Sequence, residues 1–357
     1  MTKKRDSNTS LVPERGKSLQ YEFDLFGERA ENKSVLKKPY SNTFEQADIV
    51  PKFFFTHSVV EKHWKNKGYG KPFEHCYSVK DKERGILDYK ITYKPAQIRQ
   101  KDGSFKWCFP GKSEELVDET LKKLLTNQTY GLHVPEKNGG FQTWVEFSLN
   151  MVRTELEEVG KSRNVQQIKK SISVLRGCEI EVEVNGELRY GGNLLQEYIA
   201  IDRESYQSNA SALGAVRFPT YVSSGIQQNL YRRYNFQTFM QHKGQLTRWI
   251  HKRLINKYTY ASMSKDHHFR YSSLVMSGLL NAGRSHANRE TVIKALNELV
   301  TSKVILDNYV AKPEVDERTG AITDVVYTVQ CTPGFAEDQR TANSLKGKKL
   351  NQLRIGD

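Results

Sequence analysis

The chain has 357 residues, enough for two or three domains that each bury a core, and its net charge is +14 with a pI near 9.4. This excess of Lys and Arg favours a polyanionic partner, either nucleic acid or an acidic membrane surface. The sequence shows neither a signal peptide nor an apolar run of ~20 residues, which argues against secretion and against a membrane span. A mean hydropathy of −0.67 indicates that part of the chain is disordered.

The cysteines are widely spaced and form no CxxC pair. They are Cys76, Cys108, Cys178 and Cys331. Such spacing is typical of a reducing cytoplasm and argues against a disulfide framework or a zinc site. The histidines beside Cys76, which are His57, His63 and His75, match no zinc-binding pattern. We therefore expect a cytoplasmic protein with no metal and no other cofactor.

Residues 1–50 lack hydrophobic periodicity and are rich in polar residues, so we predict a mostly disordered tail. Residues 20–26 interrupt it with Tyr21, Phe23, Leu25 and Phe26, a set of apolar side chains that can dock into a partner's cleft. The run Glu22-Phe23-Asp24-Leu25-Phe26 resembles the short peptide with which bacterial proteins bind the sliding clamp of DNA polymerase. Glu22 stands where that peptide has Gln. The alternative is a segment that folds back onto its own domain.

Residues 51–205 are predicted to form the first domain, in which residues 51–84 remain unassigned. A strand-like segment at 87–98 precedes a helix that begins at Ser113. A helix from Ser148 to Gly160 follows, then the turn Gly160-Lys161-Ser162 and a helix with Val165, Ile168, Ile172 and Leu175 inward. Residues 178–184 alternate as a strand, Asn185-Gly186 is a hairpin turn signal, and the return strand reaches Ile201.

Residues 206–335 are predicted to form the second domain, after a linker at 204–214. A long helix at 235–257 is interrupted near Gly244. A short helix from Tyr271 then leads through Gly283-Arg284-Ser285 into a helix that starts near His286, with Val292, Leu296 and Leu299 inward. Two strand-like runs follow at 304–310 and 321–329. Residues 336–357 are predicted to form a basic disordered tail.

The two domains repeat one pattern of helix, turn, helix and hairpin. The turn Gly160-Lys161-Ser162 matches Gly283-Arg284-Ser285, and Val152 and Leu156 match Val275 and Leu279. With one inserted residue, four positions of the following helices also match, namely Ile168, Lys170, Ile172 and Leu175 with Val292, Lys294, Leu296 and Leu299. This order predicts an α+β fold of two tandem winged-helix DNA-binding domains with disordered N- and C-terminal tails.

Basic residues concentrate in the second domain. Residues 231–303 hold 13 Lys and Arg against 3 Asp and Glu. We predict that duplex DNA is bound by side chains of both turns and of the helices that follow them, together with two basic residues of the long helix. They are Lys161, Ser162, Arg163, Asn164, Gln167 and Lys170 in the first domain, and Arg248, Lys252, Arg284, Ser285, His286, Asn288, Arg289, Thr291 and Lys294 in the second.

Two enzyme hypotheses receive little support. Residues 278–285 read GxxxxGRS, but a P-loop needs a lysine in place of Arg284 and a preceding strand, where a helix is predicted. The HxxR pattern of His286 and Arg289, with Tyr309 or Tyr327 downstream, is similar to part of a tyrosine recombinase site. No upstream arginine box accompanies it, so we expect a DNA-binding protein without catalytic activity.

Residues 246–254 and the winged helix after them look like plasmid replication initiators of the TrfA/RepA type. Residues 88–93 and the helix after Gly111 resemble the opening of that family's first winged helix. The resemblance implies a plasmid-associated bacterial protein that binds iterons in origin DNA, promotes opening of an AT-rich segment and takes part in copy control. It also implies recruitment of host initiator, replicative helicase and sliding clamp, and a monomer–dimer equilibrium. A winged-helix transcriptional repressor without a replication role is the main alternative.

Overall fold

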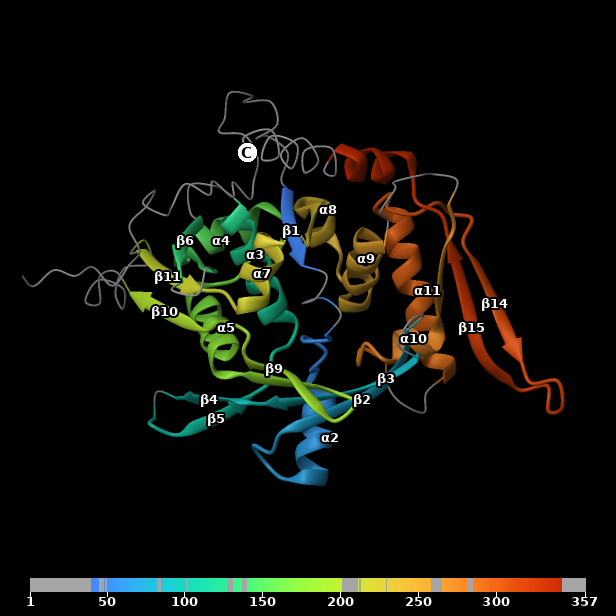
Figure 1. Cartoon of the computed structure of the whole chain (residues 1–357), viewed down its shortest axis with the longest axis horizontal. Helices are drawn as coiled ribbons and strands as arrows, with labels where there is room; N and C mark the ends of the chain where they lie inside the picture. Colours follow the sequence, from blue (N-terminus) through green and yellow to red (C-terminus); the bar gives the residue numbers. More distant parts are fainter. Residues whose placement is uncertain are drawn as a thin grey trace, which may run out of the picture.

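The computed structural model describes residues 40–44, 48, 50–81, 85–100, 102–126, 131–136, 140–200, 211, 213–228, 230–257, 265–280 and 285–341. Helices and antiparallel strands alternate along the chain (Figure 1), so the prediction of a fold that mixes the two is confirmed. Within these residues, no helix has the length and apolar character needed to cross a membrane.

The first unit, residues 112–193, packs α3 (Lys112–Thr126), α4 (Leu149–Glu158) and α5 (Val165–Gly177) against one another. Ahead of it lies α2 (His57–Lys67), which the sequence had left unassigned. A four-stranded sheet runs along the lower side in Figure 1, in the order β2-β3-β8-β9. Its strands are β2 (Phe73–Asp81), β3 (Gly85–Lys94), β8 (Glu179–Val184) and β9 (Glu187–Asn193). The hairpin turn at Asn185 and Gly186 is confirmed, with φ values of 53° and 82°.

A second four-stranded sheet, ordered β10-β11-β7-β6, packs on α3 and α4 through β6 and β7. Its strands are β6 (Gly131–Pro135), β7 (Phe141–Ser148), β10 (Glu197–Ala200) and β11 (Leu213–Arg217), and α7 (Thr220–Gln227) packs on β7. A separate two-stranded ribbon joins β4 (Ala96–Arg99) to β5 (Phe105–Cys108). Because β11 pairs with β7 and β10, a domain boundary at residue 205 would divide this sheet.

The second unit, residues 245–329, begins with α9 (Gln245–Lys257) and continues through β13 (His267–Arg270), α10 (Tyr271–Val275) and α11 (Ser285–Thr301). It ends in the hairpin of β14 (Val310–Val315) and β15 (Ile322–Val329), which projects at the right of Figure 1. The strand order is β13-β15-β14. The predicted interruption near Gly244 is confirmed, since α8 (Phe236–Gln241) precedes α9.

Three predicted boundaries are wrong. Residues 40–44, expected in the disordered tail, form β1 (Tyr40–Phe44), which pairs with β12 (Tyr231–Asn235). The strand expected at 304–310 starts only at Val310, because Val304 and Ile305 are buried in the core, where Ile305 makes an isolated bridge to Cys331. Residues 333–341, placed mostly in the C-terminal tail, are helical, with Phe335 and Ala336 buried.

Ion pairs join the two units inside the core. Arg248 on α9 donates from Nη2 to Oε2 of Glu115 on α3 at 2.6 Å and from Nη1 to the carbonyl of His242 at 2.8 Å. One turn along both helices, Nζ of Lys252 lies 2.6 Å from Oε1 of Glu119. Burial opposes the charge on Glu119, but the Lys122 and Lys252 ammonium groups hold the pKa of this carboxyl below its usual range. One hydrophobic cluster extends through both units.

A buried histidine pair lies beside these ion pairs. His242 and His251 are joined by a hydrogen bond of 2.8 Å between Nε2 and Nδ1, and the rings of Phe239 and Phe335 cover His251. Burial lowers the pKa of His242 to about 4; Arg248 and Lys161 add to this effect and Glu298 opposes it. Burial, and then the neighbouring His242, hold the pKa of His251 well below its usual range.

We therefore expect the free energy of unfolding to fall as pH drops from 7 toward 5. In this window the unfolded histidines bind protons that the folded pair refuses, which costs about 1.4 kcal/mol per pH unit for each histidine once pH is below ~6.5. Urea unfolding at pH 7.5, 6.5 and 5.5 measures the slope. His251→Leu should reduce it, whereas His286→Gln, at an exposed position, should leave it unchanged. Equal slopes in all three proteins would contradict this origin of the pH dependence.

Candidate nucleic-acid interface

The first helix–turn–helix consists of α4 and α5. Ser148 caps α4 by accepting from the backbone N–H of Met151. The helix ends at Glu158, and Gly160, two residues later, has a φ of 69°, a left-handed conformation that glycine adopts without strain. The N–H of Lys161 then bonds to the carbonyl of Leu156 at 2.8 Å, so the chain reverses sharply before α5. The predicted turn at residues 160–162 is confirmed.

Asn164 and Gln167 form a reciprocal cap at the start of α5. Oδ1 of Asn164 accepts from the N–H of Gln167 at 2.8 Å, and Oε1 of Gln167 accepts from the N–H of Asn164 at 3.0 Å. The cap uses the carbonyl oxygen of each amide and leaves the NH2 groups as donors. Both residues are exposed, so these donors can meet phosphate oxygens or base acceptors while the side chains stay ordered.

The two faces of α5 differ in chemistry. Ile168, Ile172 and Leu175 are buried, as the sequence predicts. The opposite face exposes Gln166, Gln167, Lys170, Ser173 and Arg176. Gln166, Ser173 and Arg176 were missed in the sequence, although the helical period that identified the buried face also places them on the outer one.

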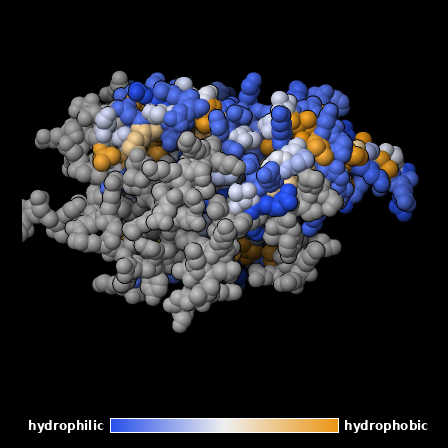
Figure 2. Space-filling model, turned by 90° about the horizontal axis from the view of Figure 1, so that it is seen from above, coloured by the Kyte–Doolittle hydropathy of each residue, from blue (hydrophilic) through white to orange (hydrophobic). Residues whose placement is uncertain are grey.

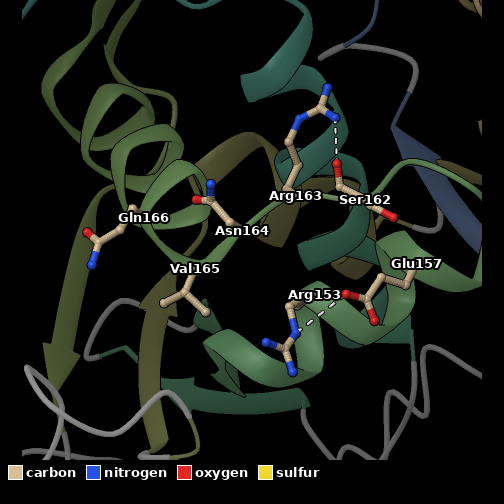
Figure 3. A pocket seen from close by; sticks show the side chains of 7 residues that line it. All are labelled: Arg153, Glu157, Ser162, Arg163, Asn164, Val165 and Gln166. Atoms are coloured by element: carbon tan, nitrogen blue, oxygen red, sulfur yellow. Dashed lines mark hydrogen bonds and ion pairs between the residues drawn. The ribbon is translucent and has the colours of Figure 1, made fainter.

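An open hollow of about 520 Å³ lies between the end of α4 and the start of α5 (Figure 3). Its lining residues are Arg153, Glu157, Ser162, Arg163, Asn164, Val165 and Gln166. Arg163 donates from Nη1 to the carbonyl of Ser162 at 2.8 Å, and Nε of Arg153 lies 3.6 Å from Glu157. Two guanidinium groups therefore flank the first turn of α5, where backbone N–H groups also favour an anion.

Lys161, also predicted to contact DNA, is half-buried. Its Nζ donates to the carbonyl of Gln241, at the end of α8, at 3.4 Å. Burial, followed by the nearby Arg248 and Lys112, lowers the pKa of this ammonium group. Lys161 thus links the first turn to α8 and presents less charge to solvent than the exposed Lys170.

The second helix–turn–helix consists of α10 and α11. Residues 281–284, including the predicted contact Arg284, lie outside the described residues, as does the side chain of Ser285. On α11, Val292, Leu296 and Leu299 are buried as predicted. His286, Thr291 and Lys294 are exposed, and Arg289 is half-buried. His286 lies 3.8 Å from Glu290, one turn further along.

The prediction that Asn288 contacts DNA is wrong. Its side chain is 4% exposed and donates from Nδ2 to the hydroxyl of Tyr271, on α10, at 2.9 Å. This bond joins the two helices of the second helix–turn–helix. Asn288 therefore supports the geometry of this element.

The prediction that Arg248 and Lys252 contact the DNA backbone is also wrong. Arg248 is fully buried and Lys252 nearly so, and both are held in ion pairs to α3. Lys252 also bonds to Asp48 at 3.1 Å. Both cations lie off the apolar stripe of α9 and face carboxylates of α3. The helical pattern of α9 alone does not reveal these partners.

The two units agree in their helices and differ in the strand that precedes the turn. In the second unit β13, which lies between α9 and α10, pairs with the return strand β15. In the first unit β7 occupies the equivalent place between α3 and α4 but pairs with β6 and β11. The matched residues Val275 and Leu279 are half-buried, whereas their counterparts Val152 and Leu156 are buried. The repeat is therefore closest in the second helix of each pair.

The surface seen from above in Figure 2 is mainly hydrophilic where the chain is described. Apolar residues are visible at several separate places on this face (Figure 2). On the β14–β15 hairpin, Val310, Val315 and Ile322 are exposed by 56%, 55% and 49%. The predicted clamp-binding peptide, Glu22 to Phe26, lies outside the described residues.

Arg248→Ala should lower the free energy of unfolding by ~3–5 kcal/mol, because it leaves the buried Glu115 carboxylate unpaired. Lys294→Ala, at an exposed position of α11, should change it by no more than about 0.5 kcal/mol. Denaturant unfolding of both variants, followed by circular dichroism, measures the difference. Equal stabilities would contradict the buried position of Arg248.

Comparison with known proteins gives structural similarities at low identity. No protein-family model matches the chain, and no curated protein matches it in sequence. A solved structure of domains 2 and 3 of RctB is 10% identical over 74% of this chain and 92% of its own, with a TM-score of 0.44. A second structure of RctB domains 2–3 is 11% identical over 76% and 95%, with a TM-score of 0.42. The Pi initiator protein, solved in complex with iteron DNA, is 12% identical over 61% and 91%, with a TM-score of 0.40.

Proposed function

We propose that the chain is a non-catalytic, sequence-specific duplex-DNA-binding protein with two tandem winged helices, and that it initiates plasmid replication at repeated origin sites. The observation that carries the proposal is the pair of helix–turn–helix elements, α4–α5 and α10–α11, each followed by a β-hairpin and both built on one core. We call α5 and α11 the reading helices.

The second unit supports the winged-helix interpretation most directly. Its elements follow the order helix, strand, helix, helix and hairpin, and the first strand joins the hairpin through β15. The outer face of α11 is polar, and a helix with its side chains, ~10–12 Å across, matches the ~12 Å width of the major groove. The projecting hairpin is then the wing.

The chemistry of the two outer faces supports a division of labour. Lys170 and Lys294 are exposed and suit phosphate oxygens, which position a protein without reading sequence. Gln166 and Gln167 on α5 and Arg289 on α11 carry donors that suit base edges. Each reading helix therefore offers both kinds of contact.

The choice of an initiator over a repressor depends on the resemblance carried by residues 246–254 and 88–93. In the fold these segments lie in α9 and β3, and neither of these elements is a reading helix. Origin opening, recruitment of host initiator, helicase and sliding clamp, and a monomer–dimer equilibrium are parts of the proposal that follow from this resemblance. A repressor would use the same reading helices.

Two features weigh against the recombinase alternative. Tyr327 is 1% exposed in β15, and burial raises the pKa of its hydroxyl to about 12. The other candidate nucleophile, Tyr309, donates to Oδ1 of Asn297 at 2.8 Å. A nucleophile for a scissile phosphate needs an accessible, activated hydroxyl.

Arg289→Ala should weaken binding to a preferred duplex by ~1–3 kcal/mol and relax base preference at one position. Selection of bound duplexes from a random library, followed by affinity measurement at fixed salt, tests this. Lys65→Ala, at an exposed position of α2 away from both reading helices, is the control and should retain the wild-type preference. Equal weakening on every sequence would make Arg289 a phosphate contact.

A footprint of the protein on DNA flanking its own gene separates the initiator from the repressor. We expect regular direct repeats beside an AT-rich segment, each protected with similar affinity. A single inverted repeat over a promoter, with no protected direct repeats, would favour the repressor. Absence of any sequence preference would contradict both.

A further inference from the structure

We infer that the contact between α3 and α9 fixes the separation of the two reading helices, so that the chain accepts only DNA sites with one spacing between their two halves. Glu115 and Arg248 are the positioning residues. The inference rests on the proposed DNA-binding function and adds a specificity determinant that touches no DNA.

The ion pairs between α3 and α9 form a two-rung ladder. Glu115 and Glu119 lie one turn apart on α3, and their partners Arg248 and Lys252 lie one turn apart on α9. Both rungs are 2.6 Å long and buried. Because the rungs lie on matching turns, they define the register of the helices along their axes and their rotation about them. A slip of one turn, ~5.4 Å, would leave two buried charges unpaired.

Arg248 makes the first rung directional. A guanidinium donates in fixed directions, and here one nitrogen bonds to Glu115 while the other bonds to the carbonyl of His242 in the α8–α9 link. Apolar packing tolerates small sliding, whereas the two Nη groups of Arg248 reach both acceptors in one arrangement only. The rung therefore holds both the facing helix and the link that leads into α9.

Hydrogen bonds also join α3 to the reading helix α5, and α9 to the reading helix α11. On the first side, Oγ of Ser171 on α5 donates to Oε1 of Glu114 on α3 at 2.8 Å. On the second side, Glu298 on α11 accepts from the hydroxyl of Thr247 and from the backbone N–H groups of Lys243 and Gly244, at the start of α9. These hydrogen bonds hold the pKa of Glu298 below its usual value against the effect of burial. The connection α5–α3–α9–α11 is thus continuous.

A second contact holds the segment that follows α10. The ring of Phe54 packs against Gly278 so closely that a Cβ there would lie 2.8 Å from it. Nε2 of His75, on β2, lies 2.6 Å from the carbonyl of Met276, and Gln245 bonds to the carbonyl of Phe53. Residues ahead of the first unit therefore hold the chain just after α10, which limits rotation of the second unit about the ladder.

If the two reading helices are held at a fixed separation, binding depends on the number of base pairs between the two half-sites. Each inserted base pair moves one half-site by ~3.4 Å and turns it by ~34–36° about the duplex axis. If the reading helices cannot follow, one of them loses its base contacts. A protein with loosely joined units would tolerate such an insertion.

The test uses the full chain and a duplex selected by the wild type from a random library. One to three base pairs are inserted at the centre of its footprint, and affinities are measured at fixed salt. For one inserted pair we expect wild-type affinity to fall by at least ~10-fold, the loss of one or more base contacts. In Glu115→Gln/Arg248→Met, which replaces the buried pair by neutral side chains of similar size, the same insertion should cost less than ~3-fold.

Lys94→Gln is the matched control, because it removes ion pairs to Glu179 and Glu181 that join β3 to β8, outside the α3–α9 contact. It should keep the wild-type spacing penalty. If the double variant does not fold, Arg248→Lys keeps the charge and loses the fork, and it should show an intermediate penalty. A folded variant with the wild-type penalty, or a wild type indifferent to spacing, would overturn the inference and leave the proposed function standing. A wild type without any sequence preference would instead refute the proposed function.

Discussion

The buried ion pairs between α3 and α9 are the interaction on which the arrangement of the molecule depends. Glu115, Glu119 and Arg248 are buried and the Lys252 side chain is only 14% exposed, so an unpaired charge at any of these positions would cost several kcal/mol. Their cost is offset only when both helices are in register and every charge meets its partner. The same constraint that holds the two units together therefore selects one arrangement of them.

This constraint explains the uneven use of basic residues. The chain carries a net charge of +14, yet several of its cations are buried and form ion pairs or hydrogen bonds inside the protein. Lys122 and Lys252 neutralise Glu119 and Asp118 within the core, and Lys161 joins a turn to α8. The outer faces of α5 and α11 keep a smaller set, in which Lys170, Lys294 and Arg289 are accessible. A reading surface of moderate charge with many amide and hydroxyl groups suits sequence discrimination better than unspecific attraction.

Much of the candidate interface was predictable because the sequence signals of the two helix pairs lie within short segments of the chain. Apolar residues three and four apart defined the buried faces of α5 and α11, and the glycine at residue 160 marked the reversal. Asn164 and Gln167 were identified for DNA contact, and their cap leaves donors for that role. The sequence did not distinguish the buried Asn288 from these exposed residues, since its hydrogen-bond partner Tyr271 lies on another helix. Val304 and Ile305 were predicted to lie in a strand because a short apolar run has the same sequence pattern in a strand and in a buried turn.

The sequence by itself determined the order of helices and strands, the repeat and the buried faces, because these follow from periodicities within one segment. Only the tertiary structure decided which charges are buried and which are free. Arg248 meets Glu115 across 133 residues of chain, and Lys252 meets Glu119 across the same separation. A basic residue off an apolar stripe reads as solvent-facing unless a distant carboxylate is brought to it, and that encounter depends on the packing of α3 against α9.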